Sequence, residues 1–210
     1  MRIVKLTLFY IGIITLSMAL SLAGVRMSVA LGFFAVIVTA MIYRHIHILY
    51  RTNNMQQVDK FVRDRQKQPF FAHIYALAYG TRADQIRVLA DVAGKYKQPT
   101  IKYNYLFNKA LLEENLEAAK EAAKHIDKDP IKSYAACYIA ALEGRTSDMH
   151  SDKLTQPWMQ PAIEAAYAHK LKDKQEFERF AGYCTDAARG VQKYALIHTF
   201  EQMKTAIVKS

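Results

Sequence analysis

The sequence predicts an all-α membrane protein, in which a two-helix transmembrane hairpin precedes a domain of repeated α-helical hairpins. Three observations lead to this prediction. Residues 1–43 contain only three charged side chains. The remaining chain is rich in Ala, Leu, Glu, Lys and Gln, which favour helices, and it has no period-two strand pattern. The breaks between its expected helices recur at intervals of 29 to 35 residues.

Two uncharged runs near the N-terminus predict the hairpin. The first is residues 6–25, and the second begins at residue 27 and continues as a helix to about residue 45. A bilayer core of about 30 Å needs roughly 20 apolar residues, so the first run is long enough and the second is near the lower limit. A cleaved signal peptide is the alternative for the first run, but it does not explain the second run. Gly24 favours a tight turn because glycine tolerates positive φ.

Basic residues at the ends of the two runs predict the topology. Arg2 and Lys5 precede the first run, further Lys and Arg residues follow the second, and Arg26 alone lies between them. Because Lys and Arg accumulate on the cytoplasmic side, both termini are expected there. The expected parts are the transmembrane hairpin at 1–51, a basic juxtamembrane helix or linker at 52–68, and a cytoplasmic helical domain at 69–210.

The segment that follows the hairpin is basic, within a chain of formal net charge +10. Anionic lipids attract such a segment, and the alternative is a topology signal on a solvated helix face. The candidate membrane-surface contacts are Arg44, Arg51, Lys60, Arg63, Arg65 and Lys67. Nucleic-acid binding is disfavoured because the remaining charge is mixed along the chain and no groove-reading or base-stacking motif is present.

Prolines and glycines divide the outer part into helices. The expected helices are 54–67, 70–79, 82–96, 101–112, 116–126, 131–142, 158–170, 174–187 and 191–208. Pro69, Pro99 and Pro130 lie at breaks, while Gly80 and Gly144 follow helix ends, where glycine is favoured. The polar residues 145–156 are expected to form at most a short helix.

These helices pair, with the turns near Gly80, Asn115, Gly144 and Asp173. The first helix of each pair has an aromatic face and the second carries small residues. A repeat of 20–50 residues is typical of helical solenoids, in which neighbouring pairs share one core.

The segment 103–130 resembles a tetratricopeptide repeat, if one deletion is allowed at the turn. Ala110, Ala119 and Ala123 match its small packing residues, Asn115 lies near its turn, and Pro130 matches its closing proline. Looser matches are 162–183, through Ala165, Ala166 and Phe177, and 70–93, through Tyr75, Ala78 and Ala90. The segment 131–156 departs from the pattern because its second helix would be short and polar. The resemblance implies a scaffold that binds partner proteins or peptides in a concave groove.

The sequence offers no catalytic, cofactor-binding or metal-binding residues. His45 and His47 do not share a helix face, and no His or Cys residue lies in a cluster with metal-ligand spacing. There is no glycine-rich phosphate loop. Cys137 and Cys184 lie in apolar surroundings, which lower the reactivity of a thiol. Two isolated cysteines are typical of a protein in a reducing compartment. An enzyme is therefore disfavoured.

Tyrosine is abundant in the expected first helices. Its rigid ring and polar hydroxyl suit a surface that is both packed and wet, although solenoid core with surface-reaching hydroxyls is the alternative. The candidate partner-binding residues are Tyr75, Tyr79, Tyr103, Tyr134, Tyr138 and Tyr167.

Two functions fit a protein that combines a membrane anchor with a helical repeat domain. The first is a membrane-anchored scaffold or adaptor that holds a cytoplasmic or membrane protein at the inner surface of the bilayer. The alternative is an accessory or regulatory subunit of a membrane complex that docks through the hairpin. An enzyme with an unrecognised site comes third. The sequence does not indicate an oligomeric state.

Overall fold

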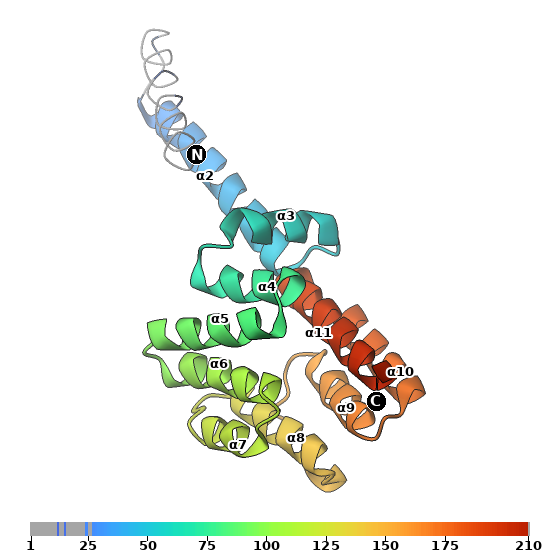
Figure 1. Ribbon diagram of the computed structural model, residues 1–210. Coiled ribbons are helices and arrows are strands. Elements are labelled where there is room, and N and C mark those ends of the chain that lie inside the picture. Colours follow the sequence, from blue (N-terminus) through green and yellow to red (C-terminus); the bar gives the residue numbers. More distant parts are fainter. Residues whose placement is uncertain (1–11, 13–14, 16–23, 25–26, 210) are drawn as a thin grey trace. The chain divides into compact units, whose positions relative to one another are not determined.

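The computed structural model describes residues 12, 15, 24 and 27–209, and within these residues it contains helices and no strand (Figure 1). The predicted all-α fold is confirmed. The predicted first span, residues 6–25, lies outside the described residues except for Gly12, Thr15 and Gly24. Gly24 has φ of +70°, the left-handed conformation expected of a glycine turn.

The chain divides into two compact units, residues 1–47 and residues 48–210. Helix α2 (Met27–Tyr50) runs across this boundary and continues past the expected end near residue 45, because no helix breaker precedes Thr52. Over Leu31–Tyr50 it is long and apolar enough to cross a membrane, and no other helix among the described residues meets that test. The two-span topology therefore stays a prediction.

The second unit contains nine further α-helices within the described residues. They are α3 (Met55–Arg65), α4 (Pro69–Tyr79), α5 (Arg82–Lys95), α6 (Pro99–Leu112), α7 (Leu116–Lys124), α8 (Ile131–Glu143), α9 (Met159–Lys170), α10 (Lys174–Ala187) and α11 (Gly190–Lys209). A single 3-10 turn, η1 (Thr146–Asp148), interrupts the polar stretch after α8.

Local chemistry explains where these helices begin and end. Thr81 and Asp84 form a reciprocal capping box at α5. The side chains of Asn115 and Asp173 accept hydrogen bonds from the first turns of α7 and α10. Pro69 and Pro99 are the first residues of α4 and α6, so α6 begins two residues earlier than expected. Proline fits this position because its missing N–H would have no partner within the helix.

Three antiparallel pairs pack within the unit: α4 with α5, α6 with α7, and α9 with α10. Helix α8 packs on α7 and α9 but has only η1 in place of a second helix, as the polar composition of 145–156 indicates. The small residues Ala119, Ala140 and Ala165 are fully buried where helices approach one another. The pairing agrees with the repeat pattern of the sequence, while kinship with tetratricopeptide repeats stays a prediction.

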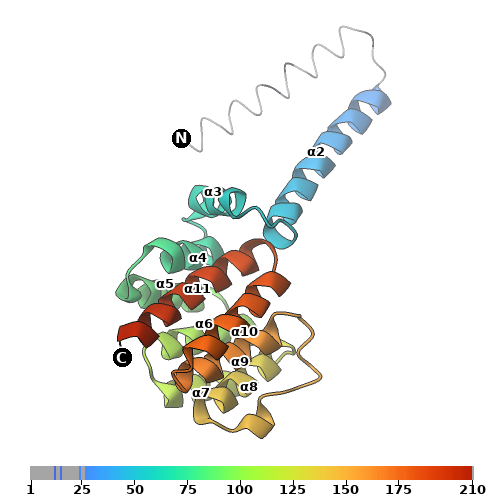
Figure 2. The same ribbon diagram turned by 90° about the vertical axis from the view of Figure 1, so that its right-hand side faces the viewer.

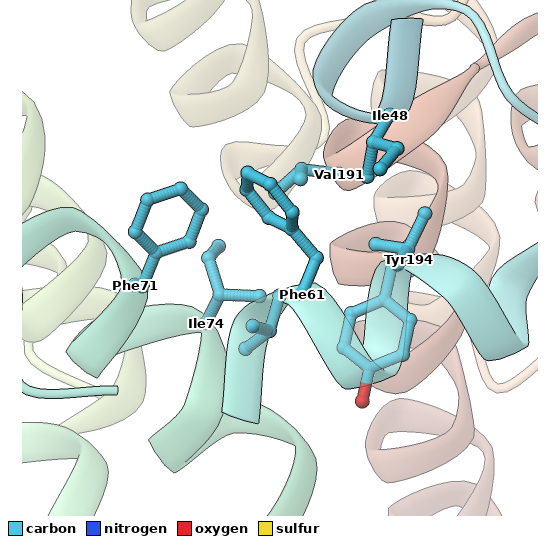
Figure 3. Packing of buried hydrophobic residues seen from close by; sticks show 8 residues of the cluster. Ile48, Phe61, Phe71, Ile74, Val191 and Tyr194 are labelled. Atoms are coloured by element: carbon cyan, nitrogen blue, oxygen red, sulfur yellow. The ribbon is translucent and has the colours of Figure 1, made fainter. Parts of the chain in front are cut away.

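The last helix returns to the first ones. Helix α11 packs against α3, α4, α9 and α10, and both views place it across the side of α4 (Figures 1 and 2). An open solenoid has no such contact, because each repeat touches only its neighbours. We call the contacts of α11 with α3, with α4 and with residues 48–52 before them the seam. The seam brings Val191 and Tyr194 against Phe61, Phe71 and Ile74 (Figure 3).

A glycine permits the closest approach at the seam. Gly190 has φ of +57°, and its N–H donates to the carbonyl oxygen of Thr52 at 2.8 Å. A Cβ atom at this position would lie 2.1 Å from the carbonyl oxygen of Leu49. Only glycine fits both the backbone conformation and the contact.

Candidate functional site

An apolar hollow of about 270 Å³ opens at the first turns of α4, α6 and α8. We call it the first-turn groove. Its lining residues are Phe70 of α4, Tyr96 after α5, Thr100, Ile101, Asn104 and Tyr105 of α6, and Ile131 of α8. Three helices that each begin a new helical unit thus contribute to one concavity.

Aromatic rings form the buried side of this groove. The ring of Tyr105 stacks on Tyr96 with centroids 6.0 Å apart and meets the ring of His73 edge-on at 5.7 Å. Burial raises the pKa of Tyr105 to about 12 and lowers the pKa of His73 to about 4, so both side chains are neutral at pH 7. The buried Nδ1 of His73 has no hydrogen-bond partner among the described residues.

The open side of the groove exposes large apolar side chains. Phe70 is 41% exposed and Ile101 is 37% exposed. Proline explains their position, because Pro69 and Pro99 start α4 and α6 and leave the next apolar residues on a first turn.

The side chain of Asn104 lines the groove and has unused hydrogen-bond donors. Asn108 Nδ2 donates to the backbone oxygen of Asn104 at 2.7 Å and to its side-chain oxygen at 3.5 Å. The Nδ2 group of Asn104 has no partner among the described residues. Pockets that combine apolar walls with a few polar groups are typical binding sites.

Three lysines are chain neighbours of residues that line the groove: Lys97 follows Tyr96, Lys102 follows Ile101, and Lys132 follows Ile131. No ion pair of the described residues includes any of the three. The Nζ atom of Lys102 lies 5.5 Å above the ring of Tyr103, which belongs to the second hollow described below.

The acidic residues nearest in sequence to α8 already have partners. Asp127 accepts a hydrogen bond from the hydroxyl of Thr100, which lowers the pKa of the Asp127 carboxyl. Asp129 accepts a hydrogen bond from Ser133 and forms an ion pair with Lys153 at 3.4 Å. Asp129 Oδ1 also accepts from the backbone N–H of Ser133 at 3.2 Å, so carboxylates already lie at the first turns of α6 and α8.

A second hollow, of about 310 Å³, lies between α6 and α7. Its ions are already paired, because Lys109 Nζ lies 2.7 Å from Glu113 and Glu121 accepts from Lys124 at 2.9 Å. The first-turn groove is the stronger candidate, since its exposed side chains are apolar and no charged residue lines it.

The six predicted tyrosines do not share one surface. Tyr75 and Tyr79 lie on α4, 5.0 Å apart, and the Tyr79 hydroxyl donates to Asp59 at the seam. Tyr103 stacks on His125 at 4.6 Å beside the second hollow. The remaining three, Tyr134, Tyr138 and Tyr167, pack around the buried contacts of α8 and α9. Whether any of them contacts a partner stays a prediction.

The predicted membrane-surface residues have different surroundings. Arg63 forms an ion pair with Asp59, and its guanidinium lies 5.1 Å above the ring of Tyr79. Arg65 lies 3.7 Å above the ring of Phe61. The other four, Arg44, Arg51, Lys60 and Lys67, are exposed. Lipid contact by these six residues stays a prediction.

The part of the chain that the structure describes contains no cluster of His, Cys, Asp and Glu that could hold a metal ion. Burial raises the pKa of both cysteine thiols, that of Cys184 to about 12. Cys184 donates a hydrogen bond to the backbone oxygen of Trp158 at 3.2 Å. These thiols are packing residues in this structure.

Sequence reasoning missed the groove residues Phe70, Ile101 and Ile131. A signal for them was present, because each comes one or two residues after a proline at a helix start: Pro69 and Pro99 are the first residues of α4 and α6, and Pro130 is the N-cap of α8. Comparison with known protein families, curated proteins and solved structures finds no match to this chain. Within the described residues, the fold and the site define a helical protein with a long apolar helix, α2, and an open apolar groove among its other helices.

Proposed function

We propose that the chain is a membrane-anchored scaffold that binds another protein in the first-turn groove at the cytoplasmic surface of the bilayer. The observation that carries the proposal is the groove itself, where three successive first helices meet and two of them leave the apolar side chains of Phe70 and Ile101 exposed. Exposed apolar patches bordered by polar residues are typical of interaction surfaces.

The apolar helix α2 supports the membrane part of the proposal. Its large side chains, among them Val36, Ile42 and Tyr43, are more than half exposed, whereas apolar side chains of the helical domain are mostly covered. Such a helix is stable in hydrocarbon, where its apolar surface needs no protein partner. The predicted hairpin and tetratricopeptide-like domain are part of the proposal.

Site-specific photo-crosslinking in native membranes tests the proposal. The full-length chain carries p-benzoylphenylalanine at position 70 in the groove or, as a matched control, at position 183. Phe70 and Tyr183 are both exposed aromatic residues, and Tyr183 lies on α10, away from the groove. We expect reproducible adducts with another protein from position 70 and none from position 183. Equal amounts of adduct from both positions, or no adduct from either, would contradict the proposed scaffold function.

The alternative, docking through the hairpin, makes a different prediction. Replacement of residues 1–47 by an unrelated membrane anchor leaves the groove intact. A groove-binding scaffold keeps its crosslinked partner after this exchange, whereas a subunit that docks through the hairpin loses it.

A further inference from the structure

We propose that residues 48–210 rest on the bilayer through a basic surface beside the end of α2, and that this surface binds anionic lipid headgroups. Its members are Arg51, Arg189 and Lys193, which we call the junction cluster. The inference rests on the membrane anchor of the proposed function. It adds a second membrane contact, formed by residues that are far apart in the sequence.

The seam brings the members of the cluster together. The N–H of Gly190 donates to the carbonyl oxygen of Thr52 at 2.8 Å. Arg189 and Arg51 directly precede these two residues, so both main chains lie at this contact. The N–H of Lys193 donates to the carbonyl oxygen of Arg189 at 3.3 Å, which places Lys193 one turn further along the chain. Arg51 was expected at the membrane from the sequence, whereas the other two residues reach this place only through the fold.

Helix α2 keeps this place close to the hydrocarbon. Its uncharged run ends at Tyr43, and Ile48 is already a buried residue of the seam, in one cluster with Val191 (Figure 3). The helical residues between them, 44–47, span only about 6 Å at a rise of about 1.5 Å per residue. The headgroup region is roughly 5 to 8 Å thick on each side of a bilayer. The length of chain therefore keeps residues 49–52 near the depth of the headgroups.

The two segments that meet at the cluster are basic. Residues 44–58 and 187–200 contain four Lys and Arg residues and no Asp or Glu. No ion pair of the described residues includes a member of the cluster. Arg189 Nη1 donates to the backbone oxygens of Asp186 and Ala188, so these bonds bring no carboxylate to its charge. The side chain of Asp186 is exposed and pairs with none of the three cations.

Cations elsewhere in the helical domain have acidic partners of their own. Arg82, Lys109 and Lys120 pair with glutamates at 2.7 to 2.8 Å. In the seam, Asp59 already accepts from Arg63. The junction cluster differs because the described part of the chain supplies no carboxylate to it. Anionic lipids of the cytoplasmic leaflet attract Lys and Arg residues held near the surface.

Exposed apolar side chains at the same place favour a bilayer over an acidic protein. Tyr50 directly precedes Arg51 and is 70% exposed, and Ile46, one turn earlier, is 46% exposed. Tyrosine is favoured at membrane interfaces, because its ring is apolar and its hydroxyl is polar. A bilayer contacts these side chains and the cations together, and α2 holds it within reach.

Fluorescence quenching in lipid nanodiscs tests the inference with the full-length chain. An NBD fluorophore is attached to the thiol introduced by Gln192→Cys, beside the cluster, or by Leu171→Cys as the control. Both positions are exposed, and Leu171 precedes α10, a helix of 14 residues that spans about 20 Å before it ends near the cluster. The two native thiols are buried, so they react slowly with the label. The quencher is a phosphatidylcholine with a nitroxide on its headgroup.

The discs contain phosphatidylcholine alone or mixed with phosphatidylserine, with equal amounts of quencher. We expect quenching at position 192 to be at least about twofold stronger in the anionic discs and to fall to the neutral level at high salt. Quenching at position 171 should be the same in both discs.

Matched double variants locate the contact. Arg51→Gln/Lys193→Gln is expected to remove most of the difference between the two discs at position 192. Lys97→Gln/Lys174→Gln removes the same charge from two exposed lysines without ion pairs, and it should keep the difference. Circular dichroism confirms that each variant is folded.

The outcomes separate the lipid surface from the scaffold function. Equal quenching at position 192 in both discs, an equal rise at position 171, or equal losses in the two double variants overturns the lipid surface. Crosslinking from position 70 judges partner binding separately, because none of these variants changes the groove. Failure of the chain to co-purify with either disc would contradict the anchor itself, and with it both proposals.

Discussion

Helix α4 contributes to both the seam and the groove, and two adjacent phenylalanines on it differ in how far they are exposed. At the seam with α3 and α11, Phe71 is only 8% exposed and packs against Phe61 at a ring distance of 5.5 Å. At the groove, the adjacent Phe70 is 41% exposed. Amino-acid type alone therefore does not determine burial here, since the packing of the neighbouring helices determines which phenylalanine is buried.

Polar groups follow the same division. At the seam, Asp59 accepts hydrogen bonds from Arg63, Tyr79 and Tyr194, and Gln202 donates to the carbonyl oxygen of Leu77 at 2.8 Å. At the groove, the Nδ2 group of Asn104 has no partner among the described residues, and Phe70 and Ile101 are exposed. The seam therefore stabilises the fold, while the groove keeps its capacity to bind.

The largest expected effect tests how tightly the seam is closed. Gly190→Ala places a Cβ against the backbone of Leu49 at a positive φ, and we expect a loss of at least about 4 kcal/mol in the free energy of unfolding. Thermal unfolding of the full chain in micelles, followed by circular dichroism, measures it. Gly94→Ala is the matched control: no atom lies near its Cβ, and helix propensity predicts a gain of up to about 1 kcal/mol. Similar effects of both changes would contradict the close contact.

A pair of isoleucines compares the two regions directly. Ile74→Ala at the seam removes a side chain that is 5% exposed and is expected to cost about 3 kcal/mol, through lost burial and a cavity. Ile101→Ala at the groove removes a partly exposed side chain and is expected to cost about 1 kcal/mol or less. Chemical denaturation of the two variants provides the test, and equal losses would show that the groove is part of the core.

The polar network of the seam is expected to have an intermediate effect. Asp59→Asn removes the charge that Arg63, Tyr79 and Tyr194 contact, and we expect a loss of about 2 kcal/mol in unfolding free energy. Asp64→Asn, on the exposed face of the same helix, is expected to change stability by less than about 0.5 kcal/mol. A loss of the same size in both variants would assign the effect to helix charge and not to the network.

The smallest expected effect is a pH dependence of the same carboxylate. Burial opposes ionisation of Asp59, but the hydrogen bonds from Arg63, Tyr79 and Tyr194 outweigh it and lower the pKa to about 2. Because the folded-state pKa lies below the unfolded value, this contribution is present above about pH 4 and is lost as the pH falls toward 2. After discounting for solvent screening, we expect about 1 kcal/mol.

The free energy of unfolding of the wild type and of Asp59→Asn, measured between pH 5 and pH 2, separates the contribution of Asp59 from those of the other carboxylates. The difference in stability between the two proteins should narrow as the pH falls. A constant difference would mean that Asp59 titrates at the same pH in the folded and unfolded chains.

The sequence predicted the helices well, because capping and helix breaking are local. Helix α10 has the predicted bounds, Lys174–Ala187, and α5 begins at Arg82 as predicted. The seam was not predicted, because it joins residues far apart: Asp59 and Tyr194 are 135 positions apart. No periodicity along one helix indicates which distant helix covers it.

The groove residues Phe70, Ile101 and Ile131 were not predicted from the sequence, and partner binding by the six tyrosines stays a prediction. In the structure, Tyr79 donates to Asp59 at the seam and Tyr134 packs on Trp158. Their ring chemistry is the same in both roles, so only the packing of neighbouring helices distinguishes them.

The return of α11 to α3 and α4 has a consequence for synthesis on the ribosome. Helices α3 and α4 are made before the residues of α11 that cover them, Val191 and Tyr194. Until α11 has been made, the apolar side chains of Phe61 and Ile74 have no cover from it. A nascent chain that stops before Gly190 therefore presents an open apolar face to chaperones and proteases.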